Sequence, residues 1–284
     1  MSIHERAMLV DISISQWSMR KYDRKISDEI TKNYNADSDS ARLNKLLIAV
    51  DESRKIVQAA GEARTFHYTN TLPWTDEGKR ILPSANYWDY VNELNIKKHK
   101  FWRIVESFWN KYDVLKDESK IRLGDLFKEE DYPPLEHLRN KYNFNISFLP
   151  IPKADDFRVD LGNDAVDRIK LEIEQTVKTA ERAAIKDMWD RLHESIKHII
   201  ERLSSSDAIF RDSLIGNVIE LAALLPKLNF TNDSRLNDLC KEINQSICTI
   251  SPENIRNDAE LRKATANKAG EIMKKVEERM NESA

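Results

Sequence analysis

The sequence contains few of the residues that interrupt regular structure. Only six glycines and eight prolines occur among 284 residues. Because glycine and proline mark turns, their scarcity predicts long elements with few connections, which means helices. Hydrophobic residues make up 40% of the chain, which is enough to form a core. This composition excludes a chain that is disordered throughout.

Cysteines and long apolar runs are also scarce. The two cysteines, Cys240 and Cys248, are too few for a disulfide framework, so nothing indicates an oxidising compartment. The N-terminal residues carry charges and lead into a mixed segment, so no signal peptide is expected. No run of about 18 apolar residues is present, so no membrane span is expected. We therefore expect a cytoplasmic protein.

The common catalytic and ligand-binding motifs are missing. His193 and His198 are five residues apart, whereas a zinc-binding pair on a helix needs a spacing of four. The segment Gly78-Lys79-Arg80 lacks the first glycine and the Ser/Thr of a phosphate loop. The acidic groups are typical of solvated loops rather than of a metal site, and they comprise Glu129, Glu130, Asp131, Asp155, Asp156 and Asp160. We predict no catalytic residue, no metal and no cofactor.

Apolar periodicity predicts a mainly helical fold with a small antiparallel sheet in the N-terminal half. Alternation of apolar and polar residues predicts strands at 7–17, 143–152 and 156–162, which could pair with one another. Residues 62–83 have no clear period and are expected to form a structured loop rich in aromatics. Helices are expected over residues 40–61, 84–112, 135–142, 209–226 and 234–247, after Pro252, and at the C-terminal end if another element covers its thin apolar stripe.

The longest predicted helix covers about Asp164 to Leu203. Its apolar residues recur at a mean spacing of about 3.7, which predicts a straight helix rather than a left-handed coiled coil. The apolar face widens after Ile185, so we expect the second half to be buried on two sides and the first half to project. The change of character after Gly162 suggests domains at residues 1–162 and 163–284. The first half carries a narrow candidate partner stripe, made of Val166, Ile169, Ile173 and Val177.

Basic and aromatic side chains are mixed along residues 62–103. Aromatic rings beside arginines hold single-stranded nucleic acid without sequence preference, but they equally pin a loop to a core. The net charge of −3 lowers the expectation that the protein mainly coats nucleic acid, without excluding a local patch. The candidate binding surface consists of Arg64, Phe66, His67, Tyr68, Trp74, Lys79, Arg80, Lys97, Lys98 and Arg103.

Five stretches, in order along nearly the whole chain, carry a resemblance to a known family. They are SISQWSMRKYDRK, ARTFHYTNTLPW, ILPSANYWDY, FNISFLPIPKADDFRVDLG and IFRDSLIGNVIELAALLPKLN. The chain resembles an uncharacterised family carried by tailed phages and integrative mobile elements, whose members tend to be encoded near MoxR-type AAA+ ATPases, von Willebrand A-domain proteins and recombination genes. The resemblance implies no catalytic residue. It implies a location in the host-cell cytoplasm and a role as scaffold or adaptor for a phage-encoded AAA+ ATPase, or as an accessory to replication and recombination.

These observations together predict a non-enzymatic interaction protein that binds a protein partner or a second copy of itself. Two alternatives remain open at this point. One is a single-stranded nucleic-acid-binding accessory that uses residues 62–103, and the other is an inhibitor of a host defence system.

Overall fold

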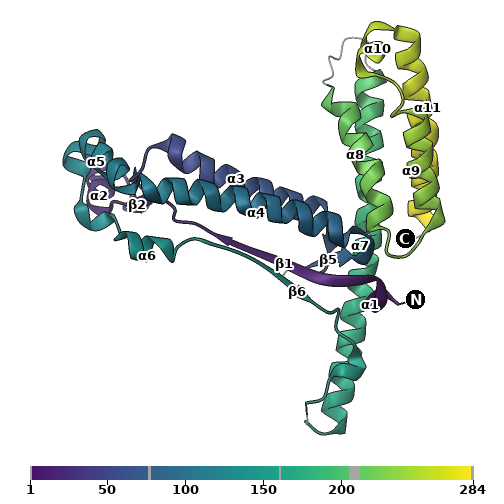
Figure 1. Ribbon diagram of the computed structural model, residues 1–284, viewed down its shortest axis with the longest axis horizontal. Coiled ribbons are helices and arrows are strands. Elements are labelled where there is room, and N and C mark those ends of the chain that lie inside the picture. Colours follow the sequence, from purple (N-terminus) through teal and green to yellow (C-terminus); the bar gives the residue numbers. More distant parts are fainter. Residues whose placement is uncertain (1, 76–77, 160, 205–211, 283–284) are drawn as a thin grey trace. The chain divides into compact units, whose positions relative to one another are not determined.

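The computed structural model describes residues 2–75, 78–159, 161–204 and 212–282 (Figure 1). Helices account for most of these residues, and a small antiparallel sheet lies in the N-terminal half, which confirms the predicted fold class. The helices are α1 (Ile3–Arg6), α2 (Arg24–Asn33), α3 (Val50–Thr69), α4 (Tyr87–Asn110), α5 (Tyr112–Leu123), α6 (Leu135–Arg139), α7 (Asn163–Ser204), α8 (Ser213–Leu228), α9 (Ser234–Ser246), α10 (Pro252–Asn257) and α11 (Ala259–Glu282). No described helix combines the length and the apolar surface that crossing a membrane requires.

The strands form two small sheets. One has the strand order β4-β5-β1-β6, and the other pairs β2 with β3. In the first sheet β5 is antiparallel to both β1 and β4, with Ala7 opposite Pro83 and Leu72 opposite Ile81. The strands are β1 (Ala7–Ser15), β2 (Arg20–Tyr22), β3 (Asn44–Leu46), β4 (Leu72–Pro73), β5 (Arg80–Pro83) and β6 (Asn143–Leu149), and four 3₁₀ turns join the helices and strands, namely η1 (Ser84–Asn86), η2 (Gly124–Leu126), η3 (Glu129–Asp131) and η4 (Ala154–Asp156).

The chain folds into two compact units, each built from separate segments. Unit 1 comprises Met1–Asp11, Tyr68–Tyr90 and Ser147–Ala284, and unit 2 comprises Ile12–His67 and Val91–Ile146. The division predicted after residue 162 stays a prediction, because compact groups of contacts do not by themselves mark domains that fold independently.

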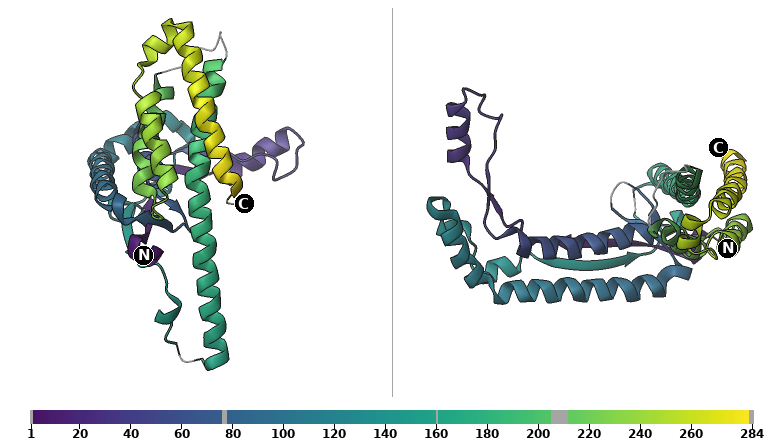
Figure 2. Two further views of the ribbon diagram at one scale, coloured as in Figure 1. Left: turned by 90° about the vertical axis from the view of Figure 1, so that its right-hand side faces the viewer. Right: turned by 90° about the horizontal axis from the view of Figure 1, so that it is seen from above.

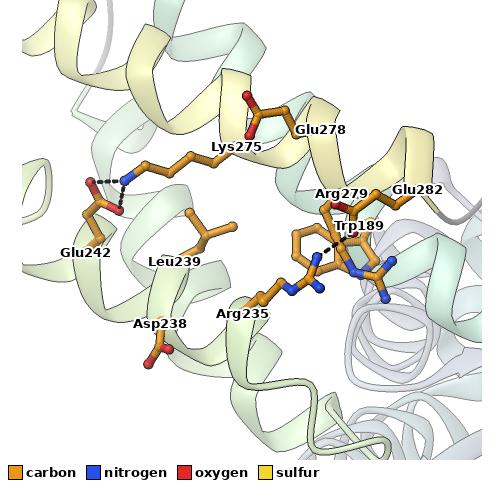
Figure 3. A pocket seen from close by; sticks show the side chains of 9 residues that line it. All are labelled: Trp189, Arg235, Asp238, Leu239, Glu242, Lys275, Glu278, Arg279 and Glu282. Atoms are coloured by element: carbon orange, nitrogen blue, oxygen red, sulfur yellow. Dashed lines mark hydrogen bonds and ion pairs between the residues drawn. The ribbon is translucent and has the colours of Figure 1, made fainter.

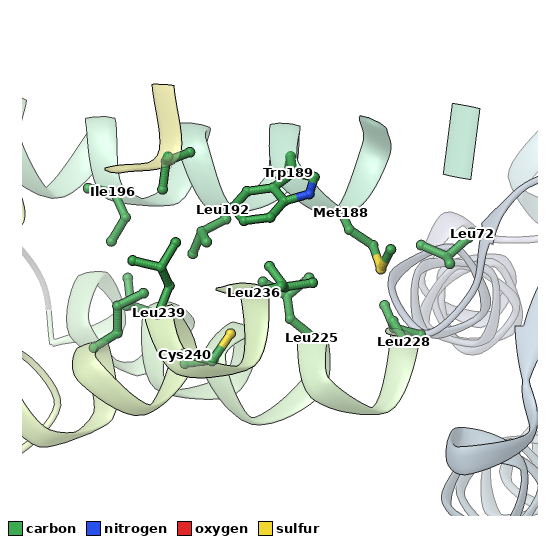
Figure 4. Packing of buried hydrophobic residues seen from close by; sticks show 14 of the residues in the cluster. Leu72, Met188, Trp189, Leu192, Ile196, Leu225, Leu228, Leu236, Leu239 and Cys240 are labelled. Atoms are coloured by element: carbon green, nitrogen blue, oxygen red, sulfur yellow. The ribbon is translucent and has the colours of Figure 1, made fainter. Parts of the chain in front are cut away.

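The core of unit 1 is a helical bundle in which α8, α9 and α11 cover the second half of α7 (Figures 1 and 2). Met188, Leu192 and Ile196 of α7 point into this core, where they meet side chains of α8 and α9 (Figure 4). Ala269 and Val276 of α11 are fully buried in the same cluster, so α11 has the cover that its thin apolar stripe needs. Burial of each large side chain stabilises the fold by about 1.5–3 kcal/mol.

The first half of α7 has much less cover. α7 is one unbroken helix of 42 residues, about 63 Å long at a rise of 1.5 Å per residue. The segment that contains η4 runs alongside its first half, and η4 packs on α7 (Figure 2). Gly162, with a φ of +82°, makes the turn between this segment and α7 in a conformation that side chains with a Cβ rarely adopt.

Unit 2 has an aromatic core and one buried ionic cluster. Phe101 and Phe108 of α4 are fully buried, and the ring of Phe101 lies 5.6 Å from that of Phe144. The ammonium group of buried Lys45 lies 2.6 Å from a carboxylate oxygen of Asp131 and 3.2 Å from one of Asp23. These partners offset the desolvation of a charge that would otherwise be too costly to bury.

Three predicted elements were wrong. The helix expected from residue 40 begins at Val50, because Asn44–Leu46 pairs with β2 as a strand. The loop expected at residues 62–83 contains the end of α3 and the hairpin of β4 and β5, since packing outweighs the small helical penalty of Gly61. The strand expected at 156–162 is not formed among its described residues, because Asp156 belongs to η4 and the others have no regular secondary structure before α7.

Smaller differences concern the ends of helices. α4 stops at Asn110, and α5 follows it almost directly. α8 continues through Pro226 to Leu228, whereas Pro226 was expected to end it. The predicted starting residues of that helix, Ile209 and Phe210, lie outside the described residues.

Candidate functional site

The predicted basic and aromatic surface is divided between the two units. Arg64, Phe66, His67, Lys97, Lys98 and Arg103 belong to unit 2, and Tyr68, Trp74, Lys79 and Arg80 belong to unit 1. Proximity in the sequence therefore does not by itself make these ten residues one surface.

In unit 2 most of these side chains contact their own unit. The guanidinium group of Arg64 donates a hydrogen bond to the carbonyl of Ile14, at 2.8 Å. The ammonium group of Lys97 lies 3.0 Å from the carboxylate of Glu93 and 5.3 Å from the ring centre of Phe66. His67 is buried, Lys98 lies 6.0 Å from the ring centre of Phe144, and Arg103 is exposed. These contacts favour a role in stabilising the fold.

The unit 1 members are also engaged locally. The guanidinium group of Arg80 donates to the hydroxyl of Thr71 at 2.7 Å and to its carbonyl at 3.1 Å. The same group lies 4.9 Å from the ring centre of Tyr68. Burial, together with nearby Arg191, lowers the pKa of Arg80, although an arginine remains charged at neutral pH. Trp74 is buried and Lys79 is half-buried.

Arg191 is a structural residue that sequence reasoning missed. From the middle of α7 its guanidinium group donates to the carbonyls of Tyr68, Thr69 and Thr71, at 3.2, 2.6 and 2.8 Å. It also lies 2.7 Å from a carboxylate oxygen of Asp187, one turn earlier. In the sequence this pair resembles any four-residue ion pair on a helix, so nothing indicated that the arginine reaches a distant segment.

The candidate partner stripe lies on the weakly covered half of α7. Val177 is buried, whereas Val166, Ile169 and Ile173 are half-buried. Three further apolar side chains stand out near this end of the helix, because Val159, Leu161 and Leu171 are 54%, 53% and 54% exposed. Sequence reasoning did not single out these three, since each is an isolated apolar residue in a polar surrounding.

A shallow groove of about 570 Å³ lies beside the stripe in unit 1. We call it the Trp74 groove. One wall is formed by the residues that follow β4, and the other is one face of α7, where side chains three, four and seven positions apart line up. Its lining consists of Trp74, Thr75, Glu172, Gln175, Thr176, Thr179 and Ala180.

A second pocket, of about 320 Å³, lies between α9 and α11 over Trp189 of α7 (Figure 3). Four of its charged side chains pair with one another, Lys275 with Glu242 and Arg235 with Glu282. Lys275 donates to both carboxylate oxygens of Glu242, at 2.7 and 2.9 Å, and this hydrogen bond lowers the pKa of Glu242. The guanidinium group of Arg235 donates a hydrogen bond to one carboxylate oxygen of Glu282. These two ion pairs form an ionic seam between α9 and α11.

The cysteines and histidines of the bundle carry no visible chemistry. Burial raises the pKa of Cys240 to about 12 and also raises that of Cys248, so both thiols stay protonated and are poor nucleophiles at neutral pH. His193 lies 3.4 Å from Glu194 and 3.8 Å from Glu277. Among the described residues, no three His, Cys, Asp or Glu side chains are grouped so that they could hold a metal ion.

Comparisons with known proteins add no functional assignment: no family model, curated protein sequence or solved structure matches this chain.

Proposed function

We propose that this chain is a non-enzymatic interaction protein that binds a protein partner through the first half of α7. The observation that carries the proposal is the contrast in cover along one helix. The second half of α7 is buried by three helices, whereas Val159, Leu161 and Leu171 are each more than half exposed around the first half. Exposed apolar side chains can mark a surface that a partner covers. Leu171 lies on the side of α7 opposite to Val166, Ile169 and Ile173, so it belongs to the exposed face of this half.

The first partner to test is a AAA+ ATPase encoded in the same phage or mobile element. The resemblance of the sequence to a phage and mobile-element family supports this choice. Self-association is the second possibility within the same proposal, because the face that binds a partner can also bind a second copy.

The nucleic-acid alternative has weaker support. Arg64 and Arg80 both direct their guanidinium groups to carbonyl oxygens of the protein, and Lys97 faces Glu93. Cations that are engaged in this way are less available to phosphates, which supply most of the affinity for single strands.

The test is a binding measurement with the purified ATPase and a Leu171→Lys variant. Lysine is a good helix former, and at position 171 it is placed four residues after Asp167 and three before Glu174, so the helix should persist. We expect the variant to bind at least about tenfold more weakly, because a charged group replaces an apolar contact.

The matched control is Ile219→Lys on α8, where the side chain is 41% exposed. This variant should bind like the original chain. Equal binding by the Leu171→Lys variant would show that the first half of α7 is not the surface. An original chain that is strictly monomeric and binds no ATPase would contradict the proposal itself.

A further inference from the structure

The Trp74 groove differs from the pocket at the α9–α11 seam in what its polar groups do. At the seam, Glu242 and Glu282 are held by Lys275 and Arg235. Among the described residues, the side chains of Thr75, Glu172, Gln175 and Thr179 form no hydrogen bond or ion pair with the rest of the chain. The groove therefore offers donors and acceptors that a ligand can use.

The kind of polar group in the groove favours an extended polypeptide. Glu172, Gln175 and Thr179 place a carboxylate, an amide and a hydroxyl along one face of α7, and Thr75 adds a second hydroxyl on the opposite wall, so the groove has both donors and acceptors. An extended segment has a free N–H and C=O at each residue and can meet such a row, whereas a helix has satisfied its backbone internally. Trp74 is buried but still lines the opposite wall, where the 9% of its surface that is exposed adds an apolar contact that a proline or an aromatic side chain can cover.

The negative charge of the groove favours a basic peptide over a nucleic acid as its ligand. Glu172 is the one ionisable side chain among the lining residues that the structure describes. A basic side chain would be attracted to Glu172. A phosphate backbone would be repelled, because the described lining residues include no lysine or arginine to compensate. The volume of about 570 Å³ falls within the usual range of ligand sites, which is about 300–1,000 Å³.

We propose that the Trp74 groove binds an extended peptide segment of the partner, with a lysine or arginine at Glu172 and a proline or aromatic side chain against Trp74. This inference rests on the proposed function, since it names the part of the partner that is bound next to the first half of α7. It assigns two positions of the peptide to two residues of the groove.

A display library of random octapeptides, selected on the full chain, tests the proposal without knowledge of the partner. We expect enriched peptides to carry Lys or Arg within two positions of Pro, Phe, Tyr or Trp. A labelled enriched peptide should bind about tenfold more weakly to a Glu172→Lys variant, because an attraction becomes a repulsion. Replacing the basic residue of the peptide by Glu should restore binding to that variant.

Glu174→Lys is the matched control, because Glu174 is an exposed glutamate on the same helix that does not line the groove. This variant should bind the peptide within about twofold of the original chain. Trp74 is buried and supports the fold, so its replacement is not used. Enrichment of acidic peptides, equal loss in both variants, failure of the charge exchange or no enrichment at all would each overturn the proposal.

The two proposals fail in distinguishable ways. If Leu171→Lys weakens partner binding while no peptide is enriched, the interaction surface stands and the peptide groove is wrong. If peptides are enriched and depend on Glu172 while the original chain binds no ATPase and does not self-associate, the groove stands as a peptide site and the proposed partner is wrong.

Discussion

The two halves of α7 have the same apolar spacing but meet different surroundings. In the second half Met188, Leu192 and Ile196 are almost completely buried under α8, α9 and α11. In the first half Val166, Ile169 and Ile173 are only half-buried beside the segment that contains η4. The contrast separates a half of α7 that is held in the helical bundle from a half whose side chains remain largely exposed.

Width of the apolar face, rather than its spacing, accounts for the difference. Trp189 and Ile200 extend the face of the second half so that helices can pack on two sides. In the first half, charged residues such as Glu172 and Glu174 flank the stripe closely, so one covering segment is all that it accommodates. The surface beside this narrow stripe stays exposed, and it is the surface that we propose a partner contacts.

The largest expected effect comes from truncating the same residue type in each half. Leu192→Ala should lower the free energy of unfolding by about 2–5 kcal/mol, because it leaves a cavity in the bundle. Leu171→Ala, on the exposed side of the first half, should change it by no more than about 0.5 kcal/mol. Urea denaturation followed by circular dichroism measures both. Similar values for the two variants would remove the contrast between the halves.

A smaller loss of stability is expected from replacing Arg191, the residue through which the second half of α7 contacts the segment before β4. Arg191→Met leaves the carbonyls of Tyr68, Thr69 and Thr71 without this donor and Asp187 without its cation, so it should cost about 1–3 kcal/mol. Arg182→Met is the control, since Arg182 is exposed on the same helix and forms no ion pair with described residues. In thermal unfolding, the melting temperature of Arg191→Met should be clearly lower than that of Arg182→Met. Equal melting temperatures would mean that the hydrogen bonds of Arg191 do not stabilise the fold.

The sequence predicted the long helix well because a repeated apolar spacing over 42 residues is a strong local signal. It also predicted that the apolar face of α7 widens after Ile185, because that width depends only on which residues flank the apolar stripe of the helix. It missed β2, β3, β4 and β5, because strands of two to four residues show too little alternation and form only by pairing with another segment.

The candidate site was less accessible to sequence reasoning. The stripe at Val166 to Val177 could be read from spacing, but the Trp74 groove joins residues about a hundred positions apart, and no local pattern indicates such a meeting. The basic and aromatic surface at 62–103 stays a prediction, and its members are distributed over both units. Sequence reasoning could not foresee that Arg64 and Arg80 donate hydrogen bonds to carbonyl oxygens within their own units.

The smallest expected effect concerns the ion pairs at the edge of the covered half. The pKa of Glu242 is lowered chiefly by its hydrogen bond from Lys275, so this group stabilises the folded chain above its unfolded pKa of 4.5, and the contribution is lost as the pH falls through the folded pKa. Because the side chain is 26% exposed, the contribution should not exceed about 1 kcal/mol. Urea denaturation at pH 7 and pH 4 should therefore show a smaller pH dependence for Glu242→Gln than for the control Glu278→Gln, which lines the same pocket without an ion pair among the described residues. The opposite outcome has two parts: pH 4 removes most of the free energy of unfolding of the original chain, and Glu242→Gln abolishes that loss. Ion pairs rather than apolar burial would then hold α9 and α11 on α7. In that case the width of the apolar face would not explain the difference between the two halves of α7.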